Sequence, residues 1–189
     1  MELMNCKHSI KAVLIGDSYV GKTSLCKAIT NGDFVNIYSR TIGIDYKVKN
    51  IVINNRELSI CLWDLCGDER FQFMFDSFVD TNKILFFMYS ADSLDSFIHM
   101  KKLFEYYLSN NYLKDKKIIV IATKIDSDNC YLDYEKHGIE FSKLYNYLFI
   151  KTSSKTKYGI QELIDMLINT IIINNKNTET IYKKNCCLM

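Results

Sequence analysis

The sequence predicts an α/β fold in three layers, built from one sheet and about five helices. The predicted sheet has six strands and is mostly parallel, with one antiparallel strand. Apolar runs of strand length alternate along the chain with segments whose apolar side chains recur at helical spacing. Polar segments follow several of these runs directly, at the places where parallel strands deliver their loops. The two patterns together indicate a sheet with helices on both faces and a ligand site at the carboxyl ends of its strands.

Six apolar runs are the candidate strands. The second and third flank Asn54-Asn55, a dipeptide that favours a hairpin turn, so we expect these two strands to be antiparallel. In chain order, the six runs are Ile10–Ile15, Ile44–Ile53, Leu58–Trp63, Ile84–Tyr89, Ile118–Ala122 and Tyr147–Lys151.

Helical spacing begins at Lys22 and is clear again after the fourth and sixth apolar runs. We expect the apolar side chains of the two later helices to pack in the core, since this spacing is far more often a buried stripe than a cofactor pocket. They are Phe97, Met100, Phe104 and Tyr107, followed by Ile160, Leu163, Ile164, Leu167, Ile168 and Ile171.

Length and composition narrow the class of protein. A chain of 189 residues with a formal net charge of +2 is expected to fold as one domain and gives no reason to expect nucleic acid as a partner. Seven cysteines without a C-x-x-C pair favour a reducing, cytosolic compartment. We expect an N-terminal extension over residues 1–7, the folded domain over 8–173 and a flexible tail over 174–189.

The segment Gly16–Thr23 reads G-D-S-Y-V-G-K-T between an apolar run and a helix start, which is the context of a P-loop. Main-chain N–H groups of such a loop cradle phosphate oxygens. We expect Lys22 to reach the β- and γ-phosphates and Thr23 to bind Mg²⁺. The α/β fold is therefore predicted to be of the P-loop NTPase type. The predicted phosphate-site residues are Gly16, Asp17, Ser18, Tyr19, Val20, Gly21, Lys22, Thr23 and Ser24.

A D-x-x-G pattern closes the third apolar run. Asp64 is predicted to hold Mg²⁺ through its water shell, and Gly67 lets a main-chain N–H group approach the γ-phosphate. The pattern carries little information alone, but it follows the P-loop lysine by about 40 residues and ends an apolar strand.

Thr123-Lys124-Ile125-Asp126 follows the fifth run. The carboxylate of Asp126 matches the N1–H and exocyclic amine of guanine, and adenine would leave that carboxylate unpaired. An ordinary strand-end turn explains this cluster equally well if it is taken alone. After the sixth run, main-chain N–H groups are expected to meet guanine O6, in a segment that includes Ser153, Ser154 and Lys155.

These four motifs, together with the segment Arg40–Tyr46 as a fifth, lie in order between about Ile10 and Ile173 and resemble those of small GTPases of the Ras superfamily, and within it of Rab proteins. The resemblance implies a monomer that binds GTP or GDP with Mg²⁺ and hydrolyses GTP slowly. It implies that Thr41 joins Thr23 and Asp64 at the metal, that Phe34 packs against guanine and that Tyr38 lies over the phosphates. Its catalytic positions are Lys22, Thr41, Gly67 and Asp68.

The resemblance also implies partners. An exchange factor, a GTPase-activating protein, a GDP-dissociation inhibitor and effectors would bind through two switch regions, residues 34–46 and 64–80. Residues 45–49 and 152–161 look most like Rabs linked to the endoplasmic reticulum and lipid droplets.

Four departures from the family pattern bear on function. Asp68 replaces the glutamine that orients the attacking water, so we predict slower hydrolysis, because an anion beside the γ-phosphate is repelled. Tyr19 places a ring in the P-loop, where it either shields the phosphates or lies on the surface. Thr123 replaces an asparagine and is expected to loosen packing between loops. Residues 78–82 lack the tyrosine-rich stretch typical of Rabs.

The chain ends Cys186-Cys187-Leu188-Met189, which reads as a prenylation motif or as the paired cysteines of many Rabs. Two prenyl groups would anchor the protein stably. We expect it on the cytoplasmic face of an intracellular membrane (endoplasmic reticulum, Golgi or vesicles), cycling with the cytosol. Two frayed, free cysteines are the alternative.

Two other functions stay open at this point. One is a GTP-binding scaffold that hydrolyses negligibly because of Asp68. The other is a P-loop enzyme that uses ATP, such as a kinase, which Asp126 argues against.

Overall fold

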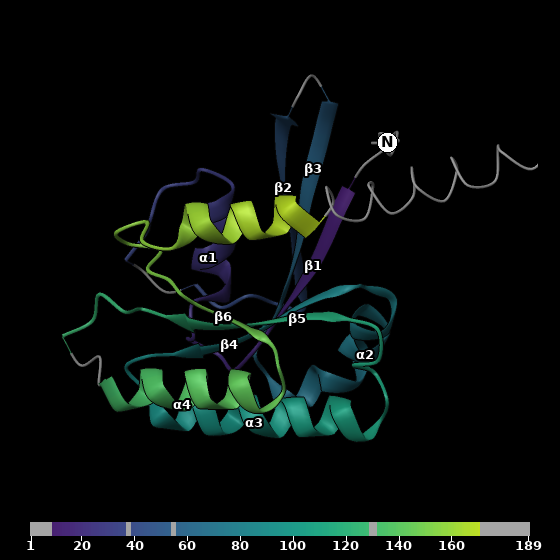
Figure 1. Ribbon diagram of the computed structural model, residues 1–189, viewed down its shortest axis with the longest axis vertical. Coiled ribbons are helices and arrows are strands. Elements are labelled where there is room, and N and C mark those ends of the chain that lie inside the picture. The colour runs from purple at the N-terminus through teal and green to yellow at the C-terminus, as the bar shows by residue number, and fades with distance from the viewer. Residues whose placement is uncertain (1–8, 37–38, 54–55, 129–131, 171–189) are drawn as a thin grey trace, which may run out of the picture.

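The computed structural model describes residues 9–36, 39–53, 56–128 and 132–170. Six strands form one sheet in the order β2-β3-β1-β4-β5-β6 (Figure 1). β2 and β3 pair antiparallel and every other pair is parallel, which confirms the predicted sheet. The strands are β1 (Ser9–Ile15), β2 (Ile44–Ile53), β3 (Arg56–Leu65), β4 (Ile84–Ser90), β5 (Lys117–Thr123) and β6 (Leu148–Lys151).

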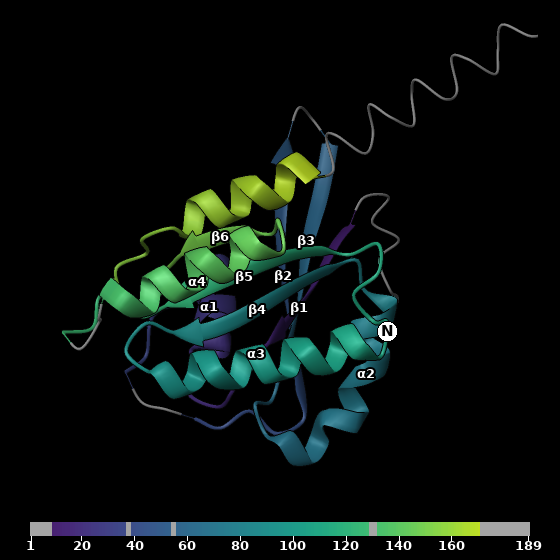
Figure 2. The ribbon, with the colours of Figure 1, turned by 60° about the horizontal axis from the view of Figure 1, so that its bottom comes forward.

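The β2–β3 pair is the longest in the sheet and reaches from Ile53↔Arg56 to Ile44↔Leu65. The predicted turn at Asn54-Asn55 lies outside the described residues, but the pairing on either side of it is that of a hairpin. β3 continues two residues beyond the predicted end at Trp63 because β2 supplies backbone partners as far as Leu65. Both ribbon views show the far end of this hairpin projecting beyond the helices (Figures 1 and 2).

Five helices cover the sheet over the described part of the chain, as predicted. They are α1 (Lys22–Ile29), α2 (Gln72–Thr81), α3 (Leu94–Ser109), α4 (Leu132–Leu144) and a last helix over residues 160–170. A single 3-10 turn, Glu69–Phe71, leads into α2. Within the described ranges, no helix combines the length and the apolar character needed to cross a bilayer.

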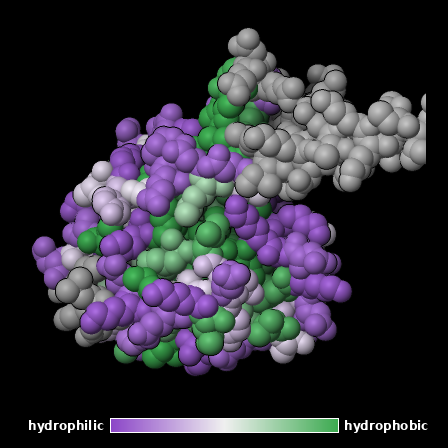
Figure 3. All heavy atoms as spheres, viewed as in Figure 1, coloured by the Kyte–Doolittle hydropathy of each residue, from purple (hydrophilic) through white to green (hydrophobic). Residues whose placement is uncertain are grey.

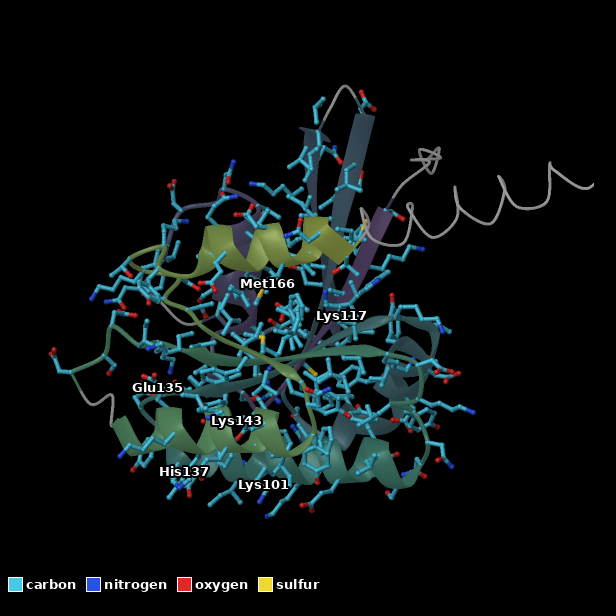
Figure 4. All side chains as sticks on the ribbon, viewed as in Figure 1. Lys101, Lys117, Glu135, His137, Lys143 and Met166 are labelled. Atoms are coloured by element: carbon cyan, nitrogen blue, oxygen red, sulfur yellow. The ribbon has the colours of Figure 1, made fainter. Side chains whose placement is uncertain are left out.

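Two buried apolar clusters, one on each face of the sheet, join the layers. α1 and the last helix pack on one face of the sheet through Leu25, Ile29, Leu163 and Leu167. α2, α3 and α4 pack on the other, so the sheet lies between two helical layers (Figure 1). Met166 points from the last helix toward the first cluster (Figure 4).

The helical stripes predicted for the core are buried where the structure describes them. Phe97, Met100, Phe104 and Tyr107 are at most 7% exposed. Ile160, Leu163, Ile164 and Leu167 are buried, Ile168 is partly buried, and Ile171 lies outside the described residues.

The β6 edge of the sheet is only partly covered. Leu148 is 40% exposed, and the space-filling view shows apolar atoms gathered between the last helix and α4 (Figure 3). Across this edge, Lys151 of β6 forms an ion pair of 2.8 Å with Glu135 of α4.

The sequence motifs meet because the parallel strands end on the same edge of the sheet. β1 ends at Ile15 before the P-loop, β5 ends at Thr123, and β6 ends at Lys151 before Ser153. β3 runs parallel to β1 and brings Asp64 opposite Leu14. The ligand site is therefore built by strand ends, as in other open α/β sheets.

Candidate nucleotide-binding site

Two glycines of the P-loop occupy positions that disfavour a side chain, for different reasons. A Cβ atom on Gly16 would lie 2.4 Å from the carbonyl oxygen of Met88 in β4. Gly21 caps the N-terminus of α1 with a φ of 91°, a left-handed conformation that glycine adopts without strain. The absence of a side chain at Gly16 therefore lets the loop lie directly against β4.

Lys22 lies in this loop with only 6% of its surface exposed. Its Nζ donates to the carbonyl oxygens of Gly16 and Asp17 at 2.8 and 2.7 Å, so the ammonium group is fixed by main chain. Burial lowers the pKa of Lys22 to about 8, since few water molecules solvate its charge, although Asp64 and Asp17 oppose the shift. A desolvated cation held in this way is suited to bind phosphate.

Three oxygen-bearing side chains from three segments meet beside Lys22. The Thr23 hydroxyl donates to Oδ2 of Asp64 over 2.5 Å and lies 2.9 Å from the hydroxyl of Thr41. Thr41 Oγ1 lies 3.4 Å from the same carboxylate oxygen. The three residues predicted to surround Mg²⁺ are therefore together.

The state of Asp64 fits a metal site. The residue is fully buried, and its Oδ1 has no hydrogen-bond partner among the described residues. Burial raises the pKa of this carboxyl, despite hydrogen bonds from Thr23 and Thr41 and the charge of Lys22. A hard divalent cation would offset that desolvation and accept hydroxyl and carboxylate oxygens as ligands. Such an ion, when bound, would neutralise phosphate charge.

Gly67 lies directly against the P-loop. A Cβ atom at this position would fall 2.1 Å from the main-chain nitrogen of Ser18 and 2.3 Å from the carbonyl carbon of Asp17. Only a residue without a side chain can bring the end of β3 this close, so Gly67 joins the second switch region to the phosphate loop.

Asp126 is oriented from behind by a buried serine. The Ser153 hydroxyl, which is fully buried, donates to Asp126 Oδ1 over 2.5 Å. Asp126 itself lines the cleft together with Ser154 and Lys155. The carboxylate is thus held at the cleft wall, as a base-recognising group must be.

Thr123 ties loops together, contrary to the expectation that it loosens them. Its hydroxyl lies 2.5 Å from the carbonyl oxygen of Val20 in the P-loop and 3.0 Å from that of Tyr89. A short hydroxyl suffices because β5 ends close to the P-loop. Lys124, the next residue, takes a left-handed φ of 55° and lies 3.6 Å from Asp92.

One cleft of about 930 Å³ connects these groups. This volume lies within the range typical of small-ligand sites. Its walls include most of the described residues predicted to bind nucleotide: Ser18, Tyr19, Gly21, Lys22, Thr23, Ser24, Phe34, Thr41, Gly67, Thr123, Lys124, Asp126, Ser154 and Lys155. Six further predicted site residues do not line it: Gly16, Asp17, Val20, Asp64, Asp68 and Ser153. Tyr38, Cys186 and Cys187 lie outside the described residues.

The structure shows where the Tyr19 ring lies and adds a contact between the P-loop and His99. Tyr19 has a left-handed φ of 65°, is 64% exposed and lines the cleft. Nδ1 of His99 in α3 lies 2.7 Å from Oδ2 of Asp17, so this histidine links α3 to the loop.

Asp68 has partners that sequence reasoning missed. Its carboxylate pairs with Arg40 of the first switch region and with Arg70, whose Nη2 and Nε lie 2.7 and 3.0 Å away. The hydrogen bonds from Arg70, with the charges of both arginines, hold the pKa of Asp68 well below its usual range. The predicted anion is present, but two cations compensate it. The only sequence signal was an arginine beside Thr41 and another two residues after Asp68.

The fold and cleft define a P-loop nucleotide-binding protein, and comparison with known proteins narrows the class. The sequence model of the Ras family matches residues 11–173. Ras-related protein RABC1 of Arabidopsis thaliana is 30% identical, over 86% of this chain and 76% of the relative. Ras-related protein Rab-18-B of Danio rerio is 31% identical over 87% and 80%, and Rab-18 of Caenorhabditis elegans is 32% identical over the same shares.

The chain therefore belongs to the Rab family of small GTPases within the Ras family. As a member of this family it binds guanine nucleotide and hydrolyses GTP to GDP and phosphate.

Proposed function

We propose that the chain is a membrane-anchored GTP/GDP switch that regulates intracellular vesicle trafficking. One observation carries the proposal: the hydroxyl of Thr41, from the first switch region, meets Thr23 and Asp64 at the predicted metal position. Gly67, from the second switch region, lies against the same P-loop. Both switch regions therefore touch the place where a γ-phosphate would bind.

A γ-phosphate at this place would order both segments and its loss would release them. Thr41 lies in the described stretch 39–43 and Gly67 in the stretch 66–68 after β3, and neither stretch forms a helix or a strand. Segments of this kind are held by few contacts of their own, so ligand contacts can decide their conformation.

Base selectivity is assigned to Asp126, with Ser153 fixing its orientation. The test is competition for the purified full chain between GDP and ADP in the presence of Mg²⁺. We expect GDP to bind more tightly by on the order of 10⁴-fold, because adenine would leave a held carboxylate unpaired. Equal affinities would overturn the proposal. An ATP-using enzyme, the third possibility from the sequence, has no support once the family is known.

Unaided hydrolysis is proposed to be slow, since Asp68 lacks the amide that orients the attacking water. We expect Asp68→Gln to raise the single-turnover rate several-fold, measured by quenching GTP-loaded protein at timed intervals. An unchanged rate would remove the explanation by Asp68. The scaffold alternative predicts negligible multiple turnover even with an activating protein that brings an arginine and a glutamine, so that assay separates the two functions.

Membrane attachment is proposed through Cys186 and Cys187. Two prenyl groups give stable anchoring where one gives only marginal binding, and Lys183 and Lys184 would each add about 1 kcal/mol near an anionic surface. Mass spectrometry of the native carboxyl terminus gives the number of lipids. Imaging of the tagged protein and of a C186S/C187S variant tests whether it lies on the endoplasmic reticulum, the Golgi or vesicles, or stays in the cytosol.

Regulators and effectors are proposed to bind the switch surface. Ile42 is 92% exposed, and Tyr46, Phe71 and Met74 are each more than a third exposed. Large apolar side chains exposed near one another are typical of protein interaction sites. Tyr46 also contacts Trp63 and Trp63 contacts Phe78, with ring centroids 4.5 and 5.2 Å apart, so an aromatic group links both switch regions.

A further inference from the structure

Arg40 occupies a place from which it can reach both switch regions and the cleft. It directly precedes Thr41, whose hydroxyl lies 2.9 Å from that of Thr23. Its own side chain lines the cleft, and its Nη2 donates to Oδ2 of Asp68. Asp68 in turn directly follows Gly67, which touches the P-loop.

Asp68 is held from both sides. Arg70 contacts the carboxylate with its Nη2, its Nε and its main-chain N–H, the last at 3.1 Å from Oδ1. The side chain of Asp68 is only 12% exposed, whereas those of Arg40 and Arg70 are 54% and 75% exposed. The carboxylate is therefore an anchored acceptor, and the side chain of Arg40 is much more exposed than it is.

Charge and donor count leave Arg40 available for a ligand. Two guanidinium groups and one carboxylate sum to a net charge of +1, and of the three residues Arg40 is the one that lines the cleft. A guanidinium group has five N–H donors in a planar fork, and the contact with Asp68 uses one nitrogen. The remaining donors match phosphate oxygens.

We propose that Arg40 is a catalytic residue of GTP hydrolysis which this chain supplies to its own site, with Asp68 as the residue that positions it. This inference rests on the proposed GTPase switch. It gives Asp68 a role different from that of a water-orienting glutamine.

The reaction needs no oxidant or further reactant. The oxygen of water bonds to the γ-phosphorus, and the bond from that phosphorus to the β–γ bridging oxygen breaks with its electron pair retained by GDP. A proton of water ends on the released phosphate. Negative charge spreads over the γ-phosphate oxygens and the bridging oxygen, and the Arg40 guanidinium stabilises it without giving up a proton.

The contribution is expected to be smaller than that of an arginine brought by a partner, which is about 10³–10⁵-fold. An exposed ion pair holds its groups weakly, since the pair competes with water and side-chain entropy. We therefore expect Arg40 to contribute about ten- to a hundredfold to the unaided rate.

A double-mutant cycle on the full chain tests both halves of the inference. Single-turnover rates are measured for the wild type, R40A, D68A and the double variant. D68A removes the acceptor that holds Arg40 without introducing the water-orienting amide of a glutamine. We expect R40A to lower the rate at least tenfold in the wild-type background and less than threefold beside D68A, where the anchor is absent. A loss of less than threefold in the wild-type background, or equal losses in both backgrounds, would overturn it. R40K is expected to fall between, because it keeps the charge but not the fork.

Binding measurements separate this inference from the proposed function. GDP and GTP affinities of R40A should stay within threefold of the wild type, so the effect lies in the rate. K49A removes a cation that contacts Asn31 away from the cleft and should leave the rate unchanged. If the wild type does not bind GTP, the proposed function itself is wrong. If it binds GTP normally but R40A hydrolyses GTP at the same rate as the wild type, only the inference about Arg40 is wrong.

A second measurement tests the inference even if GTP hydrolysis is too slow to be measured. GDP with aluminium fluoride mimics the charge of the transferring phosphoryl group. We expect the GDP-loaded wild type to bind aluminium fluoride without any activating protein, detected by slower release of a fluorescent GDP, and R40A to lose this binding. Absence of binding to the wild type, or equal binding to R40A, would overturn the inference.

Discussion

The hydroxyl of Ser153 donates to Asp126 over 2.5 Å, and this contact orients the carboxylate that we propose to recognise the base. We expect Asp126→Asn to weaken GDP binding by about 10³-fold and to favour xanthosine diphosphate, because the amide can donate to the carbonyl that xanthine carries in place of the amine. Competition with a fluorescent nucleotide measures both. D115N, an exposed position outside the cleft, is the matched control. Unchanged selectivity would remove Asp126 from the base site.

Lys22 predicts how nucleotide binding depends on pH. Burial lowers its pKa to about 8 in the free protein, and bound phosphates would raise that pKa again. Below pH 8 the ammonium form exists in both states, so affinity is constant there. Above it, binding takes up a proton, and GDP affinity should fall by up to about tenfold for each pH unit.

Calorimetry at about pH 9 in two buffers of different ionisation enthalpy measures this proton uptake. A binding enthalpy that is the same in both buffers would show that Lys22 keeps its proton throughout. Direct titration of the lysine by NMR provides an independent measurement.

At the scale of elements, the contact between the end of β3 and the P-loop is the tightest in the site. Because a Cβ on Gly67 would lie 2.1 Å from the main chain of Ser18, Gly67→Ala must push two backbone segments apart. We expect a loss of about 1–3 kcal/mol in the free energy of unfolding, measured with urea. G32A is the control, because its nearest neighbour would lie 3.2 Å away. A stable Gly67→Ala variant would mean that the contact opens freely.

The end of β5 is also held against the P-loop, here by the side chain of Thr123. Thr123 contacts the carbonyl oxygens of Val20 and Tyr89, which belong to the P-loop and to β4. An asparagine at this position is therefore not required for the loops to pack. The geometry of the strand ends decides which side chain is long enough.

At the scale of the whole molecule, the sheet and its two helical layers support the site, and the polar groups of the site lie at the edge where the parallel strands end. Buried Lys22 and Asp64 are incompletely compensated in the free protein, as their opposite pKa shifts indicate. Nucleotide and Mg²⁺ should therefore stabilise the entire domain. We expect GDP at about 1,000 times its dissociation constant to add about 4 kcal/mol, which raises Tm by roughly 8–16 °C for a domain of this size.

Thermal unfolding with GDP and Mg²⁺, compared with ADP at the same concentration, measures this effect. An equal shift with both nucleotides would contradict base recognition by the folded cleft. A shift with GDP that does not depend on Mg²⁺ would contradict the metal site at Thr23, Thr41 and Asp64.

The sequence by itself determined the architecture and the chemical groups of the site. Strand and helix periodicities predicted the sheet, its antiparallel hairpin and the buried stripe from Phe97 to Tyr107, because burial repeats with the local geometry of each element. The motifs around Lys22, Asp64 and Asp126 were legible because their chemistry is carried by a few adjacent residues.

Only the tertiary structure decided how distant side chains pair. Arg40 with Asp68, His99 with Asp17, and Thr123 with the carbonyl oxygen of Val20 join residues 28, 82 and 103 positions apart. No local period encodes such pairs, because they depend on the course of loops between the elements. The compensation of the Asp68 charge is therefore a property of the folded chain, because Arg40 and Arg70 supply it from outside the D-x-x-G pattern.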